Sequence, residues 1–375
     1  MNLRRLRHVH LQKNEEAMMH KMPAPGSGRG KAGWLCSFVP EELLMAAGFD
    51  PCRVDGRVET IERADAYTFS NLCPYVKNVL DAGLRGRLAD LSMVVLAHAC
   101  DGVRRLHDLW GHAVVQPPAF FLDVPKNTDE TAVTFYAARL ADLKGKLEET
   151  FSVAITDERL AEAIAFMNGR RRRAAPLFAL QKQHPPSIAA TALHELLHAE
   201  QTRPKGETEA LLDAAAAGQA GAAGTGNGGP RLVVAGGRLD RPELFSYIEA
   251  AGGTVVLCDT CQGLRHYEAF VEENVPPLTA LARRYLTKTG CPRMPGAEER
   301  LKRLAALAEE YDARGIVYAP LRFCDYGLFE APVLEAFFRL RGLPVLVLEN
   351  NYVWTEGERL RTRVEAFVEM VASGG

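Results

Sequence analysis

The 375-residue sequence lacks the features that mark several special classes of protein. No apolar run approaches the roughly 18 residues that a membrane-spanning helix needs. The net charge is only −2, without the strong basic excess that is typical of a nucleic-acid-binding surface. The basic N-terminus has neither the apolar core nor the small-residue cleavage site of a secretory signal. We therefore expect a cytoplasmic protein that binds neither membranes nor nucleic acid.

What the sequence does contain is a large apolar fraction and many cysteines. With 47% apolar and 25% charged residues, the composition is that of a globular protein with ample core. Structural disulfides are rare in a reducing cytoplasm, so cysteines there are buried apolar residues, nucleophiles or metal ligands. The eight cysteines to be explained are Cys36, Cys52, Cys73, Cys100, Cys258, Cys261, Cys291 and Cys324.

The alternation of short apolar runs with helical patterns predicts two parallel α/β units. A long helical segment between them has expected breaks at Pro176, Pro185–Pro186 and Pro204, and a Gly/Ala-rich linker follows it. The expected organisation is a flexible arm (1–30), a first α/β unit (31–128), a helical segment (129–212), the linker (213–230) and a second α/β unit (231–375).

Several cysteines fall next to predicted strand ends or helix starts. Cys73 precedes Pro74 at a predicted helix N-terminus, and Cys100 ends the apolar run 91–101. Cys324 lies in the loop after another buried strand. Because ligands of parallel α/β sheets bind beyond the carboxyl ends of the strands, these positions favour a functional role.

Three shorter patterns leave alternatives open. His194-Glu195-x-x-His198 matches the zinc-binding H-E-x-x-H pattern, or it belongs to a solvated amphipathic helix. The basic run 170–173 is either a solvated helix face or a docking patch. Cys258-x-x-Cys261 is a redox pair, half of a metal site or a coincidence.

Four segments, in the same order, resemble the cluster-binding subunits of 2-hydroxyacyl-CoA dehydratases and benzoyl-CoA reductases. They are GWLCSFVPEELLMAAGFDPCRV (33–54), SNLCPYVKNVL (70–80), AHACDGVRRLHDLW (97–110) and APLRFCDYGLFEAPVLEAFFRLRGLPVLVLENNY (319–352). The resemblance implies two flavodoxin-like α/β units with an iron–sulfur cluster in the cleft between them.

By this resemblance, Cys73, Cys100 and Cys324 match the three thiolates that bind a [4Fe–4S] cluster. Three thiolates on four irons leave one iron open to a substrate. The resemblance further implies an ATP-hydrolysing activator with its own iron–sulfur cluster, and a homodimer or a heterodimer with a related subunit. The implied reaction is dehydration of a 2-hydroxyacyl-CoA through a ketyl radical.

A second resemblance is to the double-cubane branch of the same family, which implies an [8Fe–9S] cluster that reduces small unsaturated molecules. Cys261 and Cys291 match additional ligands of that branch. The sequence departs from the branch at Gly290-Cys291-Pro292-Arg293, where one thiolate is missing. Either Cys258 or Cys36 could supply that thiolate.

Two polar residues beside the predicted cleft are candidates for a catalytic role. Ser37 and Glu42 could orient the substrate or shuttle a proton, although Glu42 could equally serve only the helix start. Cys52, inside a predicted strand, is expected to be a core residue. A non-catalytic partner subunit remains a further alternative, and an H-E-x-x-H zinc hydrolase is a remote one.

Overall fold

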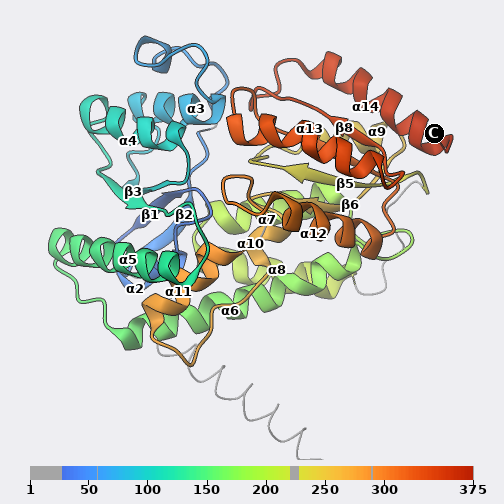
Figure 1. Cartoon of the computed structure of the whole chain (residues 1–375). Coiled ribbons are helices and arrows are strands. Elements are labelled where there is room, and N and C mark those ends of the chain that lie inside the picture. The colour runs from blue at the N-terminus through green and yellow to red at the C-terminus, as the bar shows by residue number, and fades with distance from the viewer. Residues whose placement is uncertain (1–27, 57, 220–227, 289, 375) are drawn as a thin grey trace, which may run out of the picture.

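The computed structural model describes residues 28–56, 58–219, 228–288 and 290–374. Two α/β units lie beside each other, and long helices from the middle of the chain run beneath both (Figure 1). Most of the arm expected for residues 1–30, and residues 220–227 of the expected linker, lie outside the described residues. None of the described helices is both long and apolar enough to cross a membrane.

Each unit is built on a four-stranded parallel sheet, as predicted. The sheets have the orders β2-β1-β3-β4 and β6-β5-β7-β8, so the second repeats the strand order of the first. The first contains β1 (Lys31–Leu35), β2 (Asp50–Arg53), β3 (Leu91–His98) and β4 (Ala119–Asp123). The second contains β5 (Arg231–Gly236), β6 (Thr254–Asp259), β7 (Gly315–Ala319) and β8 (Val345–Val347).

Helices cover both faces of each sheet. Those of the first half are α2 (Glu41–Ala46), η1 (Ala64–Ala66), α3 (Pro74–Leu84), α4 (Asp101–Ala113), α5 (Glu130–Phe151), α6 (Asp157–Leu180), α7 (Ala190–Thr202) and α8 (Lys205–Gln219). Those of the second half are α9 (Glu243–Ala250), α10 (Leu264–Tyr267), α11 (Pro277–Thr287), α12 (Ala297–Glu310), α13 (Asp325–Arg339) and α14 (Gly357–Ala372).

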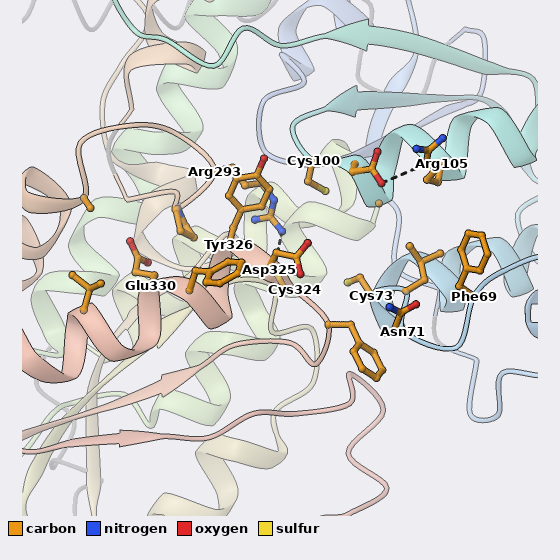
Figure 2. A pocket seen from close by; sticks show the side chains of 18 of the residues that line it. Phe69, Asn71, Cys73, Cys100, Arg105, Arg293, Cys324, Asp325, Tyr326 and Glu330 are labelled. Carbon is orange, nitrogen blue, oxygen red and sulfur yellow. Dashed lines mark hydrogen bonds and ion pairs between the residues drawn. The ribbon is translucent and has the colours of Figure 1, made fainter.

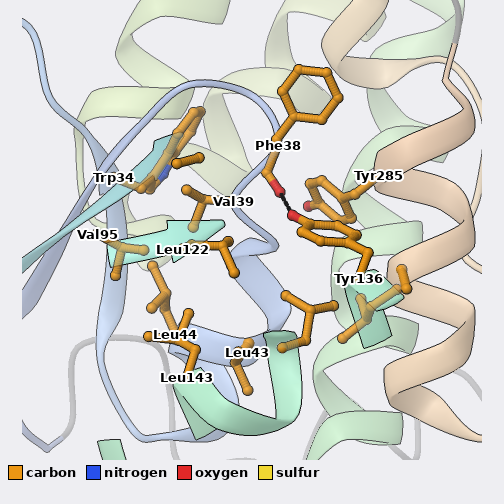
Figure 3. Packing of buried hydrophobic residues seen from close by; sticks show 14 of the residues in the cluster. Trp34, Phe38, Val39, Leu43, Leu44, Val95, Leu122, Tyr136, Leu143 and Tyr285 are labelled. Atoms are coloured by element: carbon orange, nitrogen blue, oxygen red, sulfur yellow. Dashed lines mark hydrogen bonds between the residues drawn. The ribbon is translucent and has the colours of Figure 1, made fainter. Parts of the chain in front are cut away.

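Alternation along the strands divides the first unit into two apolar layers. Trp34 pairs with Val95 in register, and both face a cluster completed by α2, α5 and α6 (Figure 3). Their neighbours Leu35 and Leu96 face α3 and α4 on the other side. A strand buried on both faces is apolar throughout, which explains the unbroken apolar runs in the sequence.

Helix α11 does not stay with the unit that its sequence position suggests. Leu281 and Tyr285 are buried in the same cluster as Trp34, and α11 lies beside α5 under the first sheet (Figure 1). Residues 231–375 are therefore not one unit in space. The chain leaves the second unit, contributes a helix to the first, and returns through the loop before α12.

The helical segment differs from the sequence prediction in two respects. Contrary to the expectation from the sequence, Pro176 does not end the helix but lies inside α6. Buried Ala174, Leu177 and Phe178 hold the helix in place around it. Helix α8 continues to Gln219, past the expected boundary at residue 212.

The basic run was also misjudged, because half of it is buried rather than solvated or available for docking. Arg170 Nε lies 2.8 Å from Glu200 Oε1, and Arg171 Nη2 lies 2.6 Å from Glu42 Oε1. These buried ion pairs join α6 to α7 and to α2 of the first unit.

Candidate functional site

A pocket of about 980 Å³ opens between the two units, beyond the carboxyl ends of β3 and β7. Its walls come from the starts of α3, α4 and α13 and from the loop before α12. Cys73, Cys100 and Cys324 all line it, and Figure 2 shows them approaching from opposite sides. The structure thus brings together the three cysteines that the sequence singled out.

Each of these cysteines occupies the N-cap position of a helix. Cys73 caps α3, Cys100 caps α4 and Cys324 caps α13. The first turn of a helix has free N–H groups and a partial positive charge, which favour a negatively charged sulfur. The backbone N–H groups of Tyr75 and Val76, at the start of α3, act to lower the pKa of the Cys73 thiol. Three helix N-termini therefore converge on the pocket and favour thiolates.

The surroundings of at least one of these thiols oppose its ionisation. Burial raises the pKa of Cys73 to about 12, and the negative charge of an ionised Cys324 adds to this effect. The two backbone N–H groups act in the opposite direction but are outweighed. A metal group that binds here must displace the Cys73 proton, so its affinity will increase with pH.

The residues fit an iron–sulfur cluster better than a single ion. Within the described residues, no three His, Cys, Asp or Glu side chains lie close enough to hold one metal ion. Instead, three thiols surround a pocket that is much wider than an ion. Thiolates are the usual ligands of iron–sulfur clusters, and three of them leave one iron open.

An arginine from the loop before α12 reaches into the same pocket. Arg293 Nη2 donates to Cys324 Sγ at 3.4 Å, and its guanidinium lies 5.8 Å from the centre of the Tyr326 ring (Figure 2). Although burial opposes the charge, ionised Cys100 and Cys324 raise the pKa of Arg293 well above its usual value. The sequence indicated this position only as the place of a missing thiolate.

A second group of thiols lies next to the first. Burial, with a smaller contribution from negative charge on the neighbouring Cys291, Cys261 and Cys100, raises the pKa of Cys36 to about 11, and the charge of Arg293 opposes this shift. Cys36 and Cys291 pack against the same apolar cluster. Cys258 is placed differently, since its sulfur contacts Thr260 Oγ1 at 3.2 Å.

Comparison with known proteins agrees with this geometry. Residues 36–371 match the family described as 2-hydroxyglutaryl-CoA dehydratase, D-component. The chain belongs to this family. The Escherichia coli K12 protein named "Putative dehydratase subunit YjiM" is 28% identical over 90% of this chain and 91% of its own.

Two further relatives of this chain carry more specific names. The lactoyl-CoA dehydratase subunit beta of Anaerotignum propionicum is 26% identical, and the (R)-phenyllactyl-CoA dehydratase beta subunit of Clostridium sporogenes is 23% identical. Each match covers 92% of both chains. Dehydratase and reductase subunits among the relatives support an enzymatic role for this chain.

The two units are joined to each other by buried polar contacts outside the pocket. Arg238 donates to the Val54 carbonyl at 2.7 Å and stacks over the Tyr75 ring at 4.1 Å. Asp240 accepts hydrogen bonds from Arg238 and from the Tyr352 hydroxyl. Since Tyr75 lies in the first turn of α3, this contact holds the helix that carries Cys73.

The two proposed catalytic residues are not part of the pocket lining. The Ser37 hydroxyl donates to the Cys261 carbonyl at 3.3 Å. Glu42 is fully buried, and its carboxylate pairs with Arg171 at 2.6 Å and accepts from the Tyr285 hydroxyl at 2.8 Å. Both of its oxygens are paired in the core, so the geometry favours a structural role, and the role suggested for Glu42 in substrate orientation stays a prediction.

The H-E-x-x-H pattern does not form a zinc site in this structure. His198 Nε2 lies 3.0 Å from Asp55 Oδ2, and the His194 ring packs 4.7 Å from Phe245. Glu195 is exposed, whereas both histidines are buried. The cavity beside His194, which Cys258 also lines, holds only about 20 Å³. Its size is that of about one water molecule.

Cys258 therefore lines a different cavity from Cys73, Cys100 and Cys324. This position does not favour the ligand role weighed for it, which stays a prediction. Cys52 is buried in β2, in agreement with its expected core role.

Proposed function

We propose that this chain is a catalytic subunit of a 2-hydroxyacyl-CoA dehydratase that holds a [4Fe–4S] cluster through Cys73, Cys100 and Cys324. The observation that carries the proposal is the convergence of three helix-capping thiols on one large pocket. The bound cluster would supply one-electron chemistry to a thioester at its open iron.

The chain's own residues would prepare this pocket for an anionic group and its substrate. Three helix N-termini and Arg293 provide positive potential around the thiolates. At the mouth, Phe69 of the first unit and Phe329 of the second are 78% and 77% exposed. Exposed apolar side chains around a pocket are typical of a binding surface, and here they suit an acyl group.

The decisive experiment is anaerobic purification of the full chain, followed by iron and sulfide analysis and electron paramagnetic resonance (EPR). We expect about four irons per chain and formation of an enoyl-CoA from a 2-hydroxyacyl-CoA. The assay would contain an ATP-hydrolysing activator and, where needed, a related subunit. Zinc without iron would refute the proposal. If turnover occurred only when a related subunit with an intact cluster site was present, this chain would have a supporting role.

One observation favours the double-cubane alternative strongly enough to test it. Negative charge on Cys291, Cys261 or Cys100 acts on the pKa of Cys36, and negative charge on Cys324 or Cys100 acts on that of Cys73, so these six thiols belong to one region of the chain. Cys36, rather than Cys258, would then supply the thiolate that the sequence pattern lacks. About eight irons per chain, with reduction of small unsaturated molecules, would favour this alternative over the dehydratase.

A further inference from the structure

Arg293 adds positive potential to the pocket, and its direct contact with one of the three thiols points to a more specific role. Its Nη2 donates to Cys324 Sγ at 3.4 Å. The loop that carries it also holds Cys291 and joins α11, in the first unit's core, to α12 of the second unit. The guanidinium is therefore attached to a segment that is anchored in both units.

The charge of Arg293 faces sulfur rather than carboxylate. Within the described part of the chain, no carboxylate forms an ion pair with it, whereas nearby Arg300 pairs with Glu330 at 2.6 Å. Lys126 approaches the same Tyr326 ring, with its Nζ 5.8 Å from the ring centre, and donates to the Ala99 carbonyl. Two cations, Arg293 and Lys126, thus flank Tyr326 beside the cysteines that line the pocket.

A cation that donates to a cluster ligand has a predictable electrostatic effect. Adding one electron to an iron–sulfur cluster increases its negative charge, and the charge is shared with the ligand sulfurs. A nearby positive charge and an N–H···S hydrogen bond stabilise the reduced form more than the oxidised form. The reduction potential of the cluster consequently rises.

We propose that Arg293 tunes the cluster site by holding a charged hydrogen bond on Cys324, which makes a bound cluster easier to reduce. The inference rests on the proposed function, since it concerns the same site. It also gives a chemical meaning to the departure at Gly290-Cys291-Pro292-Arg293: a fixed cation stands where the double-cubane pattern has a thiolate.

The test compares reduction potentials of cluster-loaded chains in a mediated spectroelectrochemical titration. One electron passes from the electrode to the cluster, and no bond breaks. We expect Arg293→Gln to shift the reduction equilibrium toward the oxidised form by about tenfold, or about 59 mV for a one-electron couple. Arg293→Lys keeps the charge and should give an intermediate potential.

Arg105→Gln is the matched control, because it removes one positive charge from the same pocket without touching sulfur. Arg105 pairs with Asp101 at 3.4 Å, and its side chain is 58% exposed. Solvent screens such a charge, so its loss should change the potential much less than the loss of Arg293.

The outcomes separate this inference from the proposed function. A wild-type chain that binds no cluster refutes both. An Arg293→Gln chain with full iron and an unchanged potential refutes the inference alone, even if it binds substrate more weakly. If the glutamine variant loses iron, the lysine variant decides: a potential equal to or above that of the wild type refutes the inference.

Discussion

The two α/β units use the same strand order to build two unequal halves of one site. Cys100-Asp101 follows β3 at the start of α4, and Cys324-Asp325 follows β7 at the start of α13. The first unit adds a second thiol, Cys73, whereas the loop before α12 adds the guanidinium of Arg293. Similar backbones thus provide a thiol-rich half and a cationic half, and the chemistry depends on bringing them together.

The units also differ in how they are attached to the helical segment. Buried ion pairs join α2 of the first unit to it, as Glu42 does with Arg171. The second unit is held by Arg231, which donates to the carbonyls of Gln183 and Gln181 at 2.9 and 3.2 Å. The Glu42 contact depends on paired charges, and the Arg231 contact on neutral hydrogen-bond acceptors, although Lys182 also pairs with Glu310 at the surface of the second unit.

The largest effect should come from removing either of the two equivalent thiols, Cys100 or Cys324. We expect Cys100→Ser and Cys324→Ser to lose most of the bound iron to a similar extent, because each removes one of three ligands from one half of the site. Iron and sulfide analysis of anaerobically purified chains measures this loss.

Cys258→Ser is the matched control, since Cys258 lines the separate cavity beside His194. It should retain the wild-type iron content. If either Cys100→Ser or Cys324→Ser retained full iron, the two positions would not be equivalent and the ligand assignment would be wrong.

The parts of the site that the sequence predicted correctly depend on local signals. The sequence Cys73-Pro74 marks a helix start, because proline is favoured in the first turn. Apolar runs identified the buried strands of both sheets. These features lie within a few residues of the cysteines, so no long-range contact was needed to place Cys73, Cys100 and Cys324 at the edges of sheets or helices.

The parts that it missed depend on contacts between distant segments. The partner of Glu42 is Arg171 on α6, and the position of Cys291 depends on α11 crossing into the first unit. Neither a charge pattern nor helical periodicity shows which buried partner a glutamate or a helix will find. The local signal of Glu42, a carboxylate in the first turn of a helix, is the same for a surface residue.

The next largest effect, a loss of stability, should come from breaking the ion pair that attaches the first unit to the helical segment. Glu42→Gln leaves the buried Arg171 guanidinium without its carboxylate, which should lower the free energy of unfolding by roughly 3–5 kcal/mol. Urea denaturation of the full chain measures it. Exposed Arg361, which pairs with Glu365 at 2.9 Å, provides the control: because solvent screens this ion pair, Arg361→Ala should change the free energy of unfolding very little.

A second substitution separates a structural role from a catalytic one. Adding Arg171→Met to Glu42→Gln removes the unpaired charge and should recover part of the lost stability. A Glu42→Gln chain of unchanged stability that has lost turnover would instead point to a catalytic role for Glu42. That result would contradict the claim that the Glu42–Arg171 ion pair attaches the first unit to the helical segment.

The smallest effect concerns the contact between the two units themselves. Burial opposes ionisation of Asp240, but Arg238 and Arg53 lower its pKa to about 2, below its ordinary value of 3.8. Because the folded-state pKa is depressed, the stabilisation is fully present above about pH 4 and is lost as the pH falls toward about 2. The shift corresponds to roughly 2 kcal/mol.

Asp240→Asn should therefore be less stable than the wild type at neutral pH, with the difference narrowing by about 2 kcal/mol between about pH 4 and pH 2. Urea denaturation across this pH range measures it. Glu59 also joins the two units, through Arg241 at 2.9 Å, but its side chain is 79% exposed. Glu59→Gln should follow the wild-type pH profile, because solvent screens its ion pair. If the stability of Asp240→Asn instead changed with pH in parallel with that of the wild type, the buried carboxylate would not carry the contact between the units. The apolar packing around Tyr75 and Tyr352 would then hold the two halves of the site together.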